Sequence, residues 1–560
     1  MPRILNPVLT GFHADPSMIR AGDTYYIANS TFEWYPGVEI HKSKDMRTWE
    51  IVPSPLSEKR LLDMTGAAAS CGIWAPCLSY SGGLFYLIYT NVRNWNTGPW
   101  KDTPNFLVTS PSIEGPWSDP VFLNASGFDP SLFHDDDGKK WLVNMEWDWR
   151  GTPEPGTGQF SGILLQEYSP EEQKLTGSVC KIYPGSEWGL VEGPHLYKRN
   201  GWYYIFAAEG GTVYRHAETV GRSRVITGPY EMHPHNPLIT SYGGRDLTVQ
   251  KAGHASWCDS PCGRSYIAFL CGRPLPGTQN CVLGRETAIA EIEWHDDWPY
   301  IKPEPGKSLF INGLAQNYPP ASFAPPGVPD TCTEVIPPVS TSCSKMYTFD
   351  GSDKQAGRLG LPLDFKTLRN EPRADTYSFS ARRGFLRLRG GESPASHFHQ
   401  TLLARRQTDF SFAAETRMEF SPGYFQEFAG LVWRYDEANQ YLLSVSHDEK
   451  YGKVLVVQTM TGGSFTKYNP VPIPEGGIWL GLTVDLHKGR FRYSFDGKTW
   501  RATGPDLDAA VLSDEYYTLG FTGAFVGIFC ADLARRSACA DFEYFSYIVQ
   551  DTAAQPEAGS

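Results

Sequence analysis

Three short segments of the chain place a carboxylate beside a proline or glycine, ahead of a run of aromatic and β-branched residues. They are His-Ala-Asp-Pro-Ser around Asp15, Gly-Phe-Asp-Pro-Ser around Asp129 and Val-Glu-Gly-Pro-His around Glu192. General acid–base catalysis commonly uses two carboxyl groups, one protonated as the acid and one ionised as the base. An Asp before Pro is also an ordinary turn residue, as at Asp119. Whether the three carboxylates are turn residues or members of one functional site must therefore be decided from their spacing along the chain.

The first half of the chain repeats a unit of about 60 residues. Its five copies begin at His13, Ile73, Gly127, Val191 and Ala252, and each indicates a short strand, a Gly-containing turn and a second strand rich in aromatic and β-branched residues. The first four copies share a proline, at Pro16, Pro76, Pro130 and Pro194, where the fifth has Ala255. Five all-β units of this length predict a five-bladed β-propeller, in which the first strand of each blade begins near the central axis.

The residues just before the shared position are therefore expected to converge on one pocket. They are Asp15, Ala75, Asp129, Gly193 with Glu192 before it, and His254. A single Asp-Pro pair favours a turn, but recurrence at equivalent points of a repeat favours a pocket lined by three carboxylates.

Bulk properties limit the class of protein. At 560 residues the chain exceeds the usual size of one hydrophobic core, which predicts two domains. No run of about 18 apolar residues is present, so no membrane segment is expected, and the net charge of -12 disfavours nucleic acid as a partner. The cysteines lack the spacing of a zinc motif, so no metal ligands are predicted. The first residues lack the features of a secretory signal, which predicts a cytoplasmic protein.

The second half has a different pattern. A Pro-rich, aperiodic stretch predicts a linker over residues 316–338, after a propeller over residues 1–315. Alternating segments over residues 339–550 predict an antiparallel β-sandwich of the jelly-roll or concanavalin-like kind. Residues 551–560 are expected to be a disordered tail. The fold class is therefore all-β throughout.

The motifs around the three carboxylates, together with the Gln-Lys-Ala-Gly-His-Ala-Ser segment at His254 and the Leu-Gly-Arg-Glu-Thr-Ala segment at Arg285, resemble glycoside hydrolase family 43, in particular its two-domain β-xylosidases. The resemblance extends into the second half of the chain. It implies an exo-acting, inverting glycosidase that releases D-xylose from the non-reducing end of β-1,4-xylo-oligosaccharides. In that family the position of Asp15 holds the general base, that of Glu192 the general acid, and that of Asp129 a residue that orients the acid and raises its pKa.

The same resemblance implies further substrate-binding residues: Phe32, Trp74, Trp147, Thr212, His254, Arg285 and, from the second domain, Phe525 in Thr-Gly-Ala-Phe-Val-Gly-Ile-Phe. Phe525 would close one end of the propeller groove and so impose exo cleavage. Each aromatic in this set has a second interpretation as core packing, His254 as an internally satisfied histidine, and Arg285 as a solvated strand end.

Several alternatives stay open at this point. The nearest is an α-L-arabinofuranosidase, or an enzyme with both activities, on the same fold and mechanism. One of another class is a non-catalytic carbohydrate-binding propeller, which would be expected to lack one of the three carboxylates. No cofactor is required for acid–base chemistry, whereas a structural calcium ion, including one near His254, and a homo-oligomer are left open. The run Asp135-Asp136-Asp137-Gly138 is more simply a hairpin tip than a calcium loop.

Overall fold

A computed structural model describes residues 2–151, 159–311, 313–340, 344–350, 357–517 and 519–550. The chain divides into two compact units: one holds residues 1–273 and 285–341, and the other holds residues 274–284 and 342–560. The predicted tail, residues 551–560, lies outside the described residues. Within the described ranges no α-helix is present, and no helix is long and apolar enough to cross a membrane.

The first unit contains five antiparallel sheets that follow one another along the chain. Blade one consists of β2 (Ala14–Ala21), β3 (Thr24–Ser30), β5 (Glu39–Ser43) and β6 (Thr48–Val52), and β4 (Trp34–Tyr35) lies in the β3–β5 connection. Blade two is β7 (Gly72–Ser81), β8 (Leu84–Val92), β9 (Asn105–Ser110) and β10 (Val121–Asn124). Blade three is β11 (Ser131–His134), β12 (Lys140–Trp147), β13 (Phe160–Ser169) and β14 (Lys174–Tyr183). Blade four is β15 (Glu192–Arg199), β16 (Trp202–Glu209), β17 (Ala217–Ser223), β18 (Glu231–Met232) and β19 (Ile239–Thr240), and blade five is β20 (Gln250–Asp259), β21 (Ser265–Gly272), β22 (Arg285–His295) and β23 (Trp298–Ile301).

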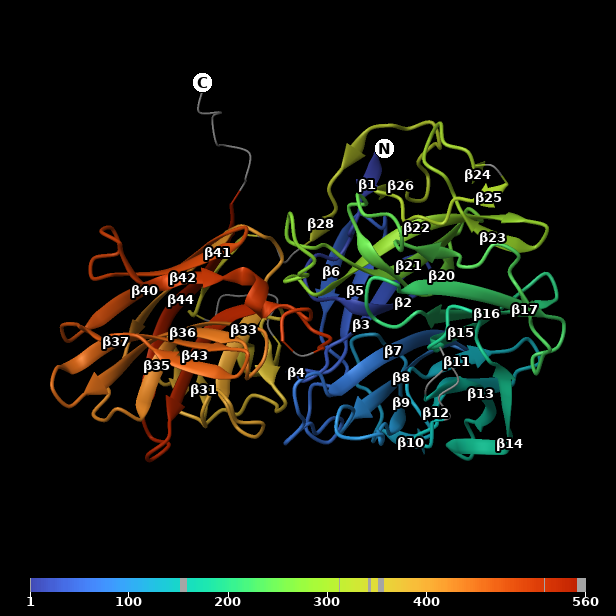
Figure 1. The fold of residues 1–560 in the computed structure, drawn as a ribbon. Coiled ribbons are helices and arrows are strands. Elements are labelled where there is room, and N and C mark those ends of the chain that lie inside the picture. Colours follow the sequence, from blue (N-terminus) through green and yellow to red (C-terminus); the bar gives the residue numbers. More distant parts are fainter. Residues whose placement is uncertain are drawn as a thin grey trace, which may run out of the picture. The chain divides into compact units, whose positions relative to one another are not determined.

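The first strands of the five blades close a ring. β2 contacts β7, β7 contacts β11, β11 contacts β15, β15 contacts β20, and β20 contacts β2. In Figure 1 these strands lie at the centre of the unit, while the last strands β6, β10, β14 and β23 lie further out. The predicted five-bladed propeller is therefore confirmed, and the starts of the five first strands meet around one axis.

Apolar clusters between neighbouring blades hold the ring together. Leu107 of blade two packs with Leu142 of blade three, and Phe206 of blade four packs with Phe269 of blade five. The middle strands of the blades are covered on both faces, so their sequences are continuous apolar runs. In β21, for example, all eight residues are buried.

The segment that was expected to be a linker belongs to the first unit. Its strands β26 (Ser322–Phe323) and β27 (Val335–Ile336) pair with the two edges of β1 (Arg3–Leu5), and the following β28 (Val339–Ser340) extends blade one by pairing with β6. The amide of Asn6 donates to the carbonyls of Ile289 and Pro320. Residues 316–338 thus differ from a free linker, because their backbone groups find partners on the propeller. A short hairpin of β24 (Phe310–Ile311) and β25 (Leu314–Ala315) precedes them.

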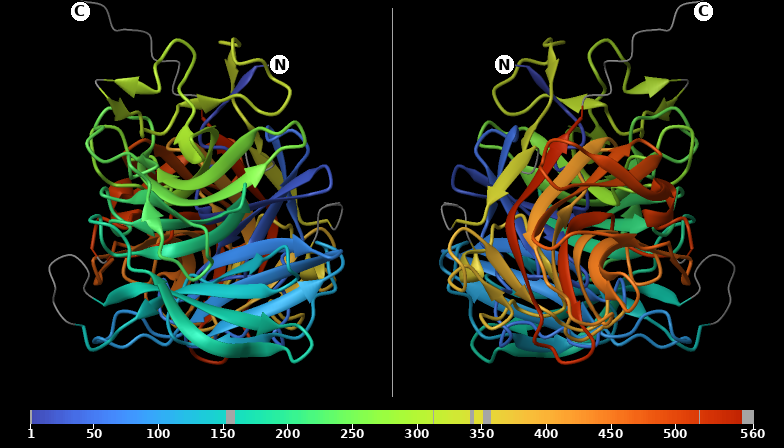
Figure 2. Two further views of the ribbon diagram at one scale, coloured as in Figure 1. Left: turned by 90° about the vertical axis from the view of Figure 1, so that its right-hand side faces the viewer. Right: turned by 90° about the vertical axis from the view of Figure 1, so that its left-hand side faces the viewer.

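The second unit is a sandwich of two antiparallel sheets, seen as the orange and red strands in Figure 1 and in the right-hand view of Figure 2. One sheet has the order β31 (Tyr377–Ser378), β32 (Leu386–Arg389), β44 (Cys539–Val549), β34 (Phe412–Glu419), β40 (Gly477–Asp485), β41 (Lys488–Ser494) and β42 (Arg501–Asp508), with β29 (Lys345–Thr348) also paired to β44. The other has the order β33 (Thr401–Arg406), β43 (Phe525–Asp532), β35 (Glu427–Arg434), β36 (Gln440–Asp448), β37 (Gly452–Thr461) and β38 (Ser464–Lys467), with β39 (Val471–Pro472) also paired to β37. The remaining short elements are β30 (Thr367–Leu368) and the 3-10 turns Arg358–Gly360 and Ala509–Leu512.

The sandwich core includes residues from the loop between β21 and β22. Leu275, Val282 and Leu283 are buried in one cluster with sandwich residues such as Leu443 and Val526. The sandwich is therefore built from two separate stretches of the chain.

Candidate active site

The five positions that the repeat aligns share an uncommon backbone conformation. Asp15, Ala75, Asp129, Gly193 and His254 have positive φ angles of 52°, 32°, 54°, 55° and 46°. Such angles are unfavourable for residues other than glycine and persist where the surrounding structure imposes them. The pairing of the first two strands is irregular at this point in blades one, two, four and five. The recurrence of this kink at the central end of every blade shows that the aligned residues are structurally equivalent.

Asp15 is buried and has a polar neighbour at each carboxylate oxygen. The Ser30 hydroxyl donates to Oδ2 at 2.6 Å, and the same hydroxyl accepts from the amide of Ala75. Oδ1 lies 3.5 Å from Nδ1 of His254 and 3.9 Å from Nη1 of Arg285. Asp15 is thereby contacted by a side chain of its own blade and by two side chains of blade five.

Asp129 lies between the strands of blades three and four. Its Oδ2 accepts a hydrogen bond of 3.1 Å from the backbone amide of Gly193. Burial raises the pKa of Asp129 well above its ordinary value, and the nearby charges of Glu192 and Asp15 add to the increase, while the Gly193 amide and Arg285 oppose it.

Glu192 is the first residue of β15 and is 6 % exposed. Burial raises its pKa from 4.5 to about 8; Arg285 and Lys101 act against this increase, and Asp15 adds to it. Glu192 and Asp129 also interact, so the two carboxyls hold protons as a pair. At neutral pH this pocket therefore contains a protonated carboxyl that can serve as a proton donor.

The acid stands one residue before the aligned position because a side chain would not fit there. A Cβ on Gly193 would lie 2.8 Å from Nε2 of His254, and Cβ atoms in proteins essentially never approach another heavy atom that closely. Burial lowers the pKa of His254, although Asp15 partly offsets the effect, so the imidazole is neutral at pH 7. The neutral ring packs directly against the backbone that carries Glu192.

Arg285 is the first residue of β22 and is 4 % exposed. Besides facing Asp15, its charge lowers the pKa values of both Glu192 and Asp129. One buried cation, Arg285, thus lies near all three carboxyls.

Aromatic rings stand beside the carboxylates in blades one to three. Trp74 lies 6.0 Å from Phe32 and 5.3 Å from Phe128, measured between ring centroids, and Phe128 lies 6.2 Å from Trp147. The indole of Trp74 donates to the carbonyl of Ser70. The structure thus brings the predicted Phe32, Trp74 and Trp147 into one continuous wall through Phe128, which immediately precedes Asp129.

Two other predicted residues are not joined to this group. Thr212 lies in the β16–β17 loop, is partly exposed, and makes no hydrogen bond to the three carboxyls within the ranges described. Phe525 begins β43 in the second unit, where it is buried and lies beside Arg406, whose guanidinium carbon is 5.7 Å from its ring centroid. Its expected place at the mouth of the propeller stays a prediction.

Lys101 is a site residue that the sequence did not reveal. Its Nζ lies 4.2 Å from the ring centroid of Trp147 and donates to the carbonyl of Trp95. Burial lowers its pKa to about 8, and its charge acts on Glu192. It stands in a non-repeated loop of blade two, so no pattern marked it. Phe128, by contrast, could have been selected because it belongs to the same motif as Asp129.

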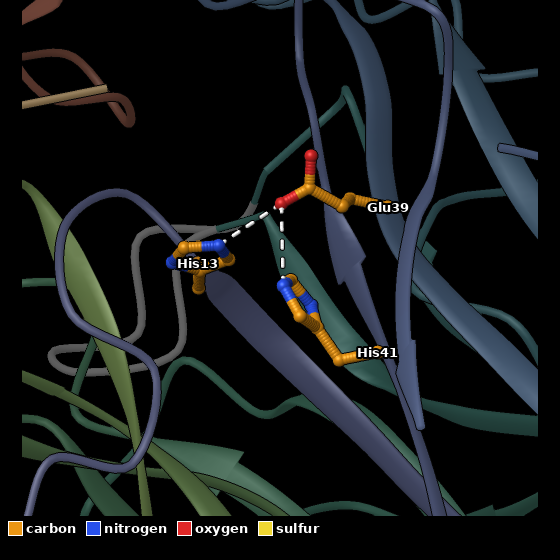
Figure 3. Close-up of side chains that lie close together, drawn as sticks. All are labelled: His13, Glu39 and His41. Carbon is orange, nitrogen blue, oxygen red and sulfur yellow. Dashed lines mark hydrogen bonds and ion pairs between the residues drawn. The ribbon is translucent and has the colours of Figure 1, made fainter. Parts of the chain in front are cut away.

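A second buried cluster lies just before Asp15 in the chain (Figure 3). Nε2 of His13 lies 3.0 Å from Oε1 of Glu39, and Nε2 of His41 lies 3.9 Å from the same oxygen. Glu39 and His41 are two apart on β5 and so share a face. Their ligand atoms and that of His13 lie within 4.8 Å of one another, so the three side chains could hold a metal ion. The sequence had predicted no metal ligands. The His13–Glu39 contact also fixes the backbone two residues before Asp15 without a metal.

The surroundings of His254 offer little to a calcium ion. Calcium takes six to eight oxygen ligands, whereas the charged oxygen nearest the His254 ring within the described chain is Oδ1 of Asp15.

Comparisons with known proteins agree along the chain. The model of the family "Glycosyl hydrolases family 43" matches residues 4–299, and that of the "Beta xylosidase C-terminal Concanavalin A-like domain" matches residues 358–548. The chain is 46 % identical over 559 residues to "Xylosidase/arabinosidase 43B" of Humicola insolens, covering 98 % of each, and 43 % identical over 559 residues to "Beta-xylosidase" of Bacillus subtilis, covering 97 % of this chain and 99 % of that protein. Among solved structures, "xylan beta-1,4-xylosidase from Bacillus Halodurans C-125" is 46 % identical with a TM-score of 0.89, covering 98 % of this chain and 100 % of that one.

Proposed function

The chain belongs to glycosyl hydrolases family 43, and on that premise we propose that it releases D-xylose from the non-reducing end of β-1,4-xylo-oligosaccharides with inversion at the anomeric carbon. The observation that carries the proposal is the buried pocket in which Glu192, with a pKa of about 8, stands near Asp15 and Asp129. The names of the relatives supply the sugar and the linkage.

The two catalytic residues divide one displacement between them. Asp15 takes a proton from a water molecule as the water oxygen attacks the anomeric carbon, and Glu192 gives its proton to the glycosidic oxygen as the bond to that oxygen breaks. The product is α-xylose plus the shortened oligosaccharide, and both carboxyls return to their starting states by exchanging a proton with solvent. This mechanism requires no metal or other cofactor.

Asp129 is proposed as a positioning residue. Its hydrogen bond from the Gly193 amide ties it to the backbone next to Glu192. Burial is the first cause of the raised Glu192 pKa, and Glu192 and Asp129 titrate as a pair. We therefore expect Asp129 both to orient the Glu192 carboxyl and to help keep it protonated.

The pocket residues are assigned by chemistry. Trp74 and Phe32 present apolar faces to the C–H face of a pyranose ring, and Arg285 donates to its hydroxyls. Phe525, from the second unit, is proposed to block one end of the groove so that only a terminal sugar enters.

A second candidate activity has a specific motivation. The Humicola insolens relative carries both xylosidase and arabinosidase in its name, and β-xylopyranose and α-L-arabinofuranose place several hydroxyls alike. Initial rates on the two nitrophenyl glycosides compare the activities, and we expect the higher kcat/KM on the xyloside.

Proton NMR of xylobiose hydrolysis tests the proposed mechanism. The first signal to rise should be that of α-xylose, before mutarotation. Early β-xylose would overturn inversion and the roles of Asp15 and Glu192 with it, and the absence of hydrolysis would overturn the proposed substrate.

A further inference from the structure

The sandwich carries a groove on the face of one sheet that points away from its core. The floor comes from alternate residues of β36 and β37: Leu442, Ser444, Val454, Val456 and Gln458. The residues between them, such as Leu443 and Val457, pack into the core. The groove has a volume of about 350 Å³, within the range of sites for small molecules. All of its lining residues belong to the second unit.

Apolar side chains stand exposed along the groove. Phe425, Phe465 and Leu533 are 49 %, 59 % and 40 % exposed, and all three line the groove. Exposed apolar groups scattered singly need no explanation, but several around one depression mark a binding site. The two phenyl faces suit the C–H face of a sugar ring.

The hydroxyl of Ser444 on the groove floor lacks a good partner. Ser444 is 1 % exposed, yet its hydroxyl reaches only the carbonyl of Val456 at 3.4 Å and Oε1 of Gln458 at 3.5 Å. Buried polar groups normally have well-placed partners, so the Ser444 hydroxyl on the groove floor is poorly satisfied.

The charges that line the groove select a neutral ligand. Asp448 and Lys467 bring one charge of each sign, and Asp448 is already engaged by the amides of Lys450 and Tyr451. Neighbouring strands lie about 4.8 Å apart, so the distance from β35 to β38 is about 14 Å. A polyanion or a strongly charged peptide would find no complementary surface here.

We propose that this groove is a second, non-catalytic binding site for a β-1,4-xylo-oligosaccharide. A chain of pentopyranose rings is neutral, offers hydroxyls to Ser444, and offers C–H faces to Phe425 and Phe465. The inference rests on the proposed action on xylo-oligosaccharides, which identifies the sugar. A site on the sandwich holds the enzyme on its polymeric source while the propeller removes terminal xylose.

Calorimetric titration of the full-length chain with xylotetraose tests the proposal. Glu192→Gln slows turnover by about 10²- to 10⁴-fold, and Asp15→Asn is a second inactivated background if the first does not fold. We expect two bound molecules per chain in either background. Adding Phe425→Ala and Phe465→Ala should weaken one of the two sites by about tenfold and leave the other unchanged. Tyr451→Ala removes an aromatic that is 47 % exposed on the same sheet but outside the groove, and should change neither site.

The remaining outcomes would refute the proposed binding site in the groove without affecting the proposed function. One bound molecule in both inactive backgrounds, or two that the phenylalanine substitutions leave unchanged, would refute it. A lower sedimentation mass of the Phe425→Ala, Phe465→Ala variant, with sugar binding intact, would identify a second copy of the chain as the occupant instead. Wild-type hydrolysis of xylobiose is measured separately, and its absence would contradict the proposed function rather than the groove.

Discussion

Replacing Glu192 with Gln removes the proton that this buried carboxyl holds at neutral pH. With a pKa of about 8, roughly nine in ten Glu192 side chains are protonated at pH 7. A carboxyl at its ordinary value of 4.5 would be protonated in only about one molecule in 300. Burial of Glu192 thus makes the acid form the dominant one at neutral pH.

The size of the effect depends on the leaving group. General acid catalysis contributes about 10²- to 10⁴-fold, so Glu192→Gln should reduce kcat/KM on xylobiose by that factor because a sugar alkoxide leaves poorly. A dinitrophenolate leaves without protonation, so the same variant should lose less than about tenfold on dinitrophenyl xyloside. Wild-type kcat/KM on xylobiose should fall as the pH rises through about 8, where Glu192 loses its proton.

Initial rates on both substrates between pH 5 and 10 provide the assay, with circular dichroism as the control for folding. Equal losses on the two substrates would refute the role of Glu192 as acid. A wild-type alkaline limb near pH 5 would refute the argument that burial raises its pKa.

Three further predictions concern the same pocket. Because the raised pKa makes the native state bind a proton more tightly than the unfolded state between pH 4.5 and about 8, wild-type stability should fall as the pH rises through that window. Glu192→Gln should therefore raise the melting temperature at pH 9 but not at pH 4. The corresponding gain in the free energy of unfolding at pH 9 has an upper limit of about 5 kcal/mol. Equal changes in melting temperature at the two pH values would contradict this prediction. Gly193→Ala forces a Cβ against His254 at a positive φ and should lower the free energy of unfolding by about 1–2 kcal/mol, measured by denaturant titration against Gly82→Ala, where a Cβ meets open space at a similar φ. Lys101→Met removes a charge that lowers the Glu192 pKa and should move the alkaline limb of kcat/KM to higher pH; a limb that stays in place or moves down would show that Lys101 does not act on the acid.

The sequence predicted the features that repeat. The period of the first half, and the coincidence of Asp15, Asp129 and Glu192 with it, were enough to predict the propeller and to bring the carboxylates to its axis. The common positive φ was not predictable, because Ala75 is not a residue type that favours a left-handed conformation.

Features set by tertiary contacts were not visible. The Pro-rich stretch 316–338 has the composition of a linker, and only the position of β1 shows that its backbone has partners. Lys101 lies far along the chain from each carboxylate, and its role depends on the rings around it. The close packing of His254 against the aligned position in blade four was also not visible, because it depends on the contact between Gly193 and a histidine of another blade.

The loop between β21 and β22 has a consequence for protein engineering. Residues 274–284 leave the fifth blade, contribute Leu275, Val282 and Leu283 to the sandwich core, and return to the blade at Arg285. The backbone therefore passes between the two units three times rather than once. A chain cut at residue 341 would leave these three apolar side chains without their core, prone to aggregation, and would loosen the strand that begins with Arg285. A stable, active propeller fragment would therefore need a redesigned loop as well as a new C-terminus.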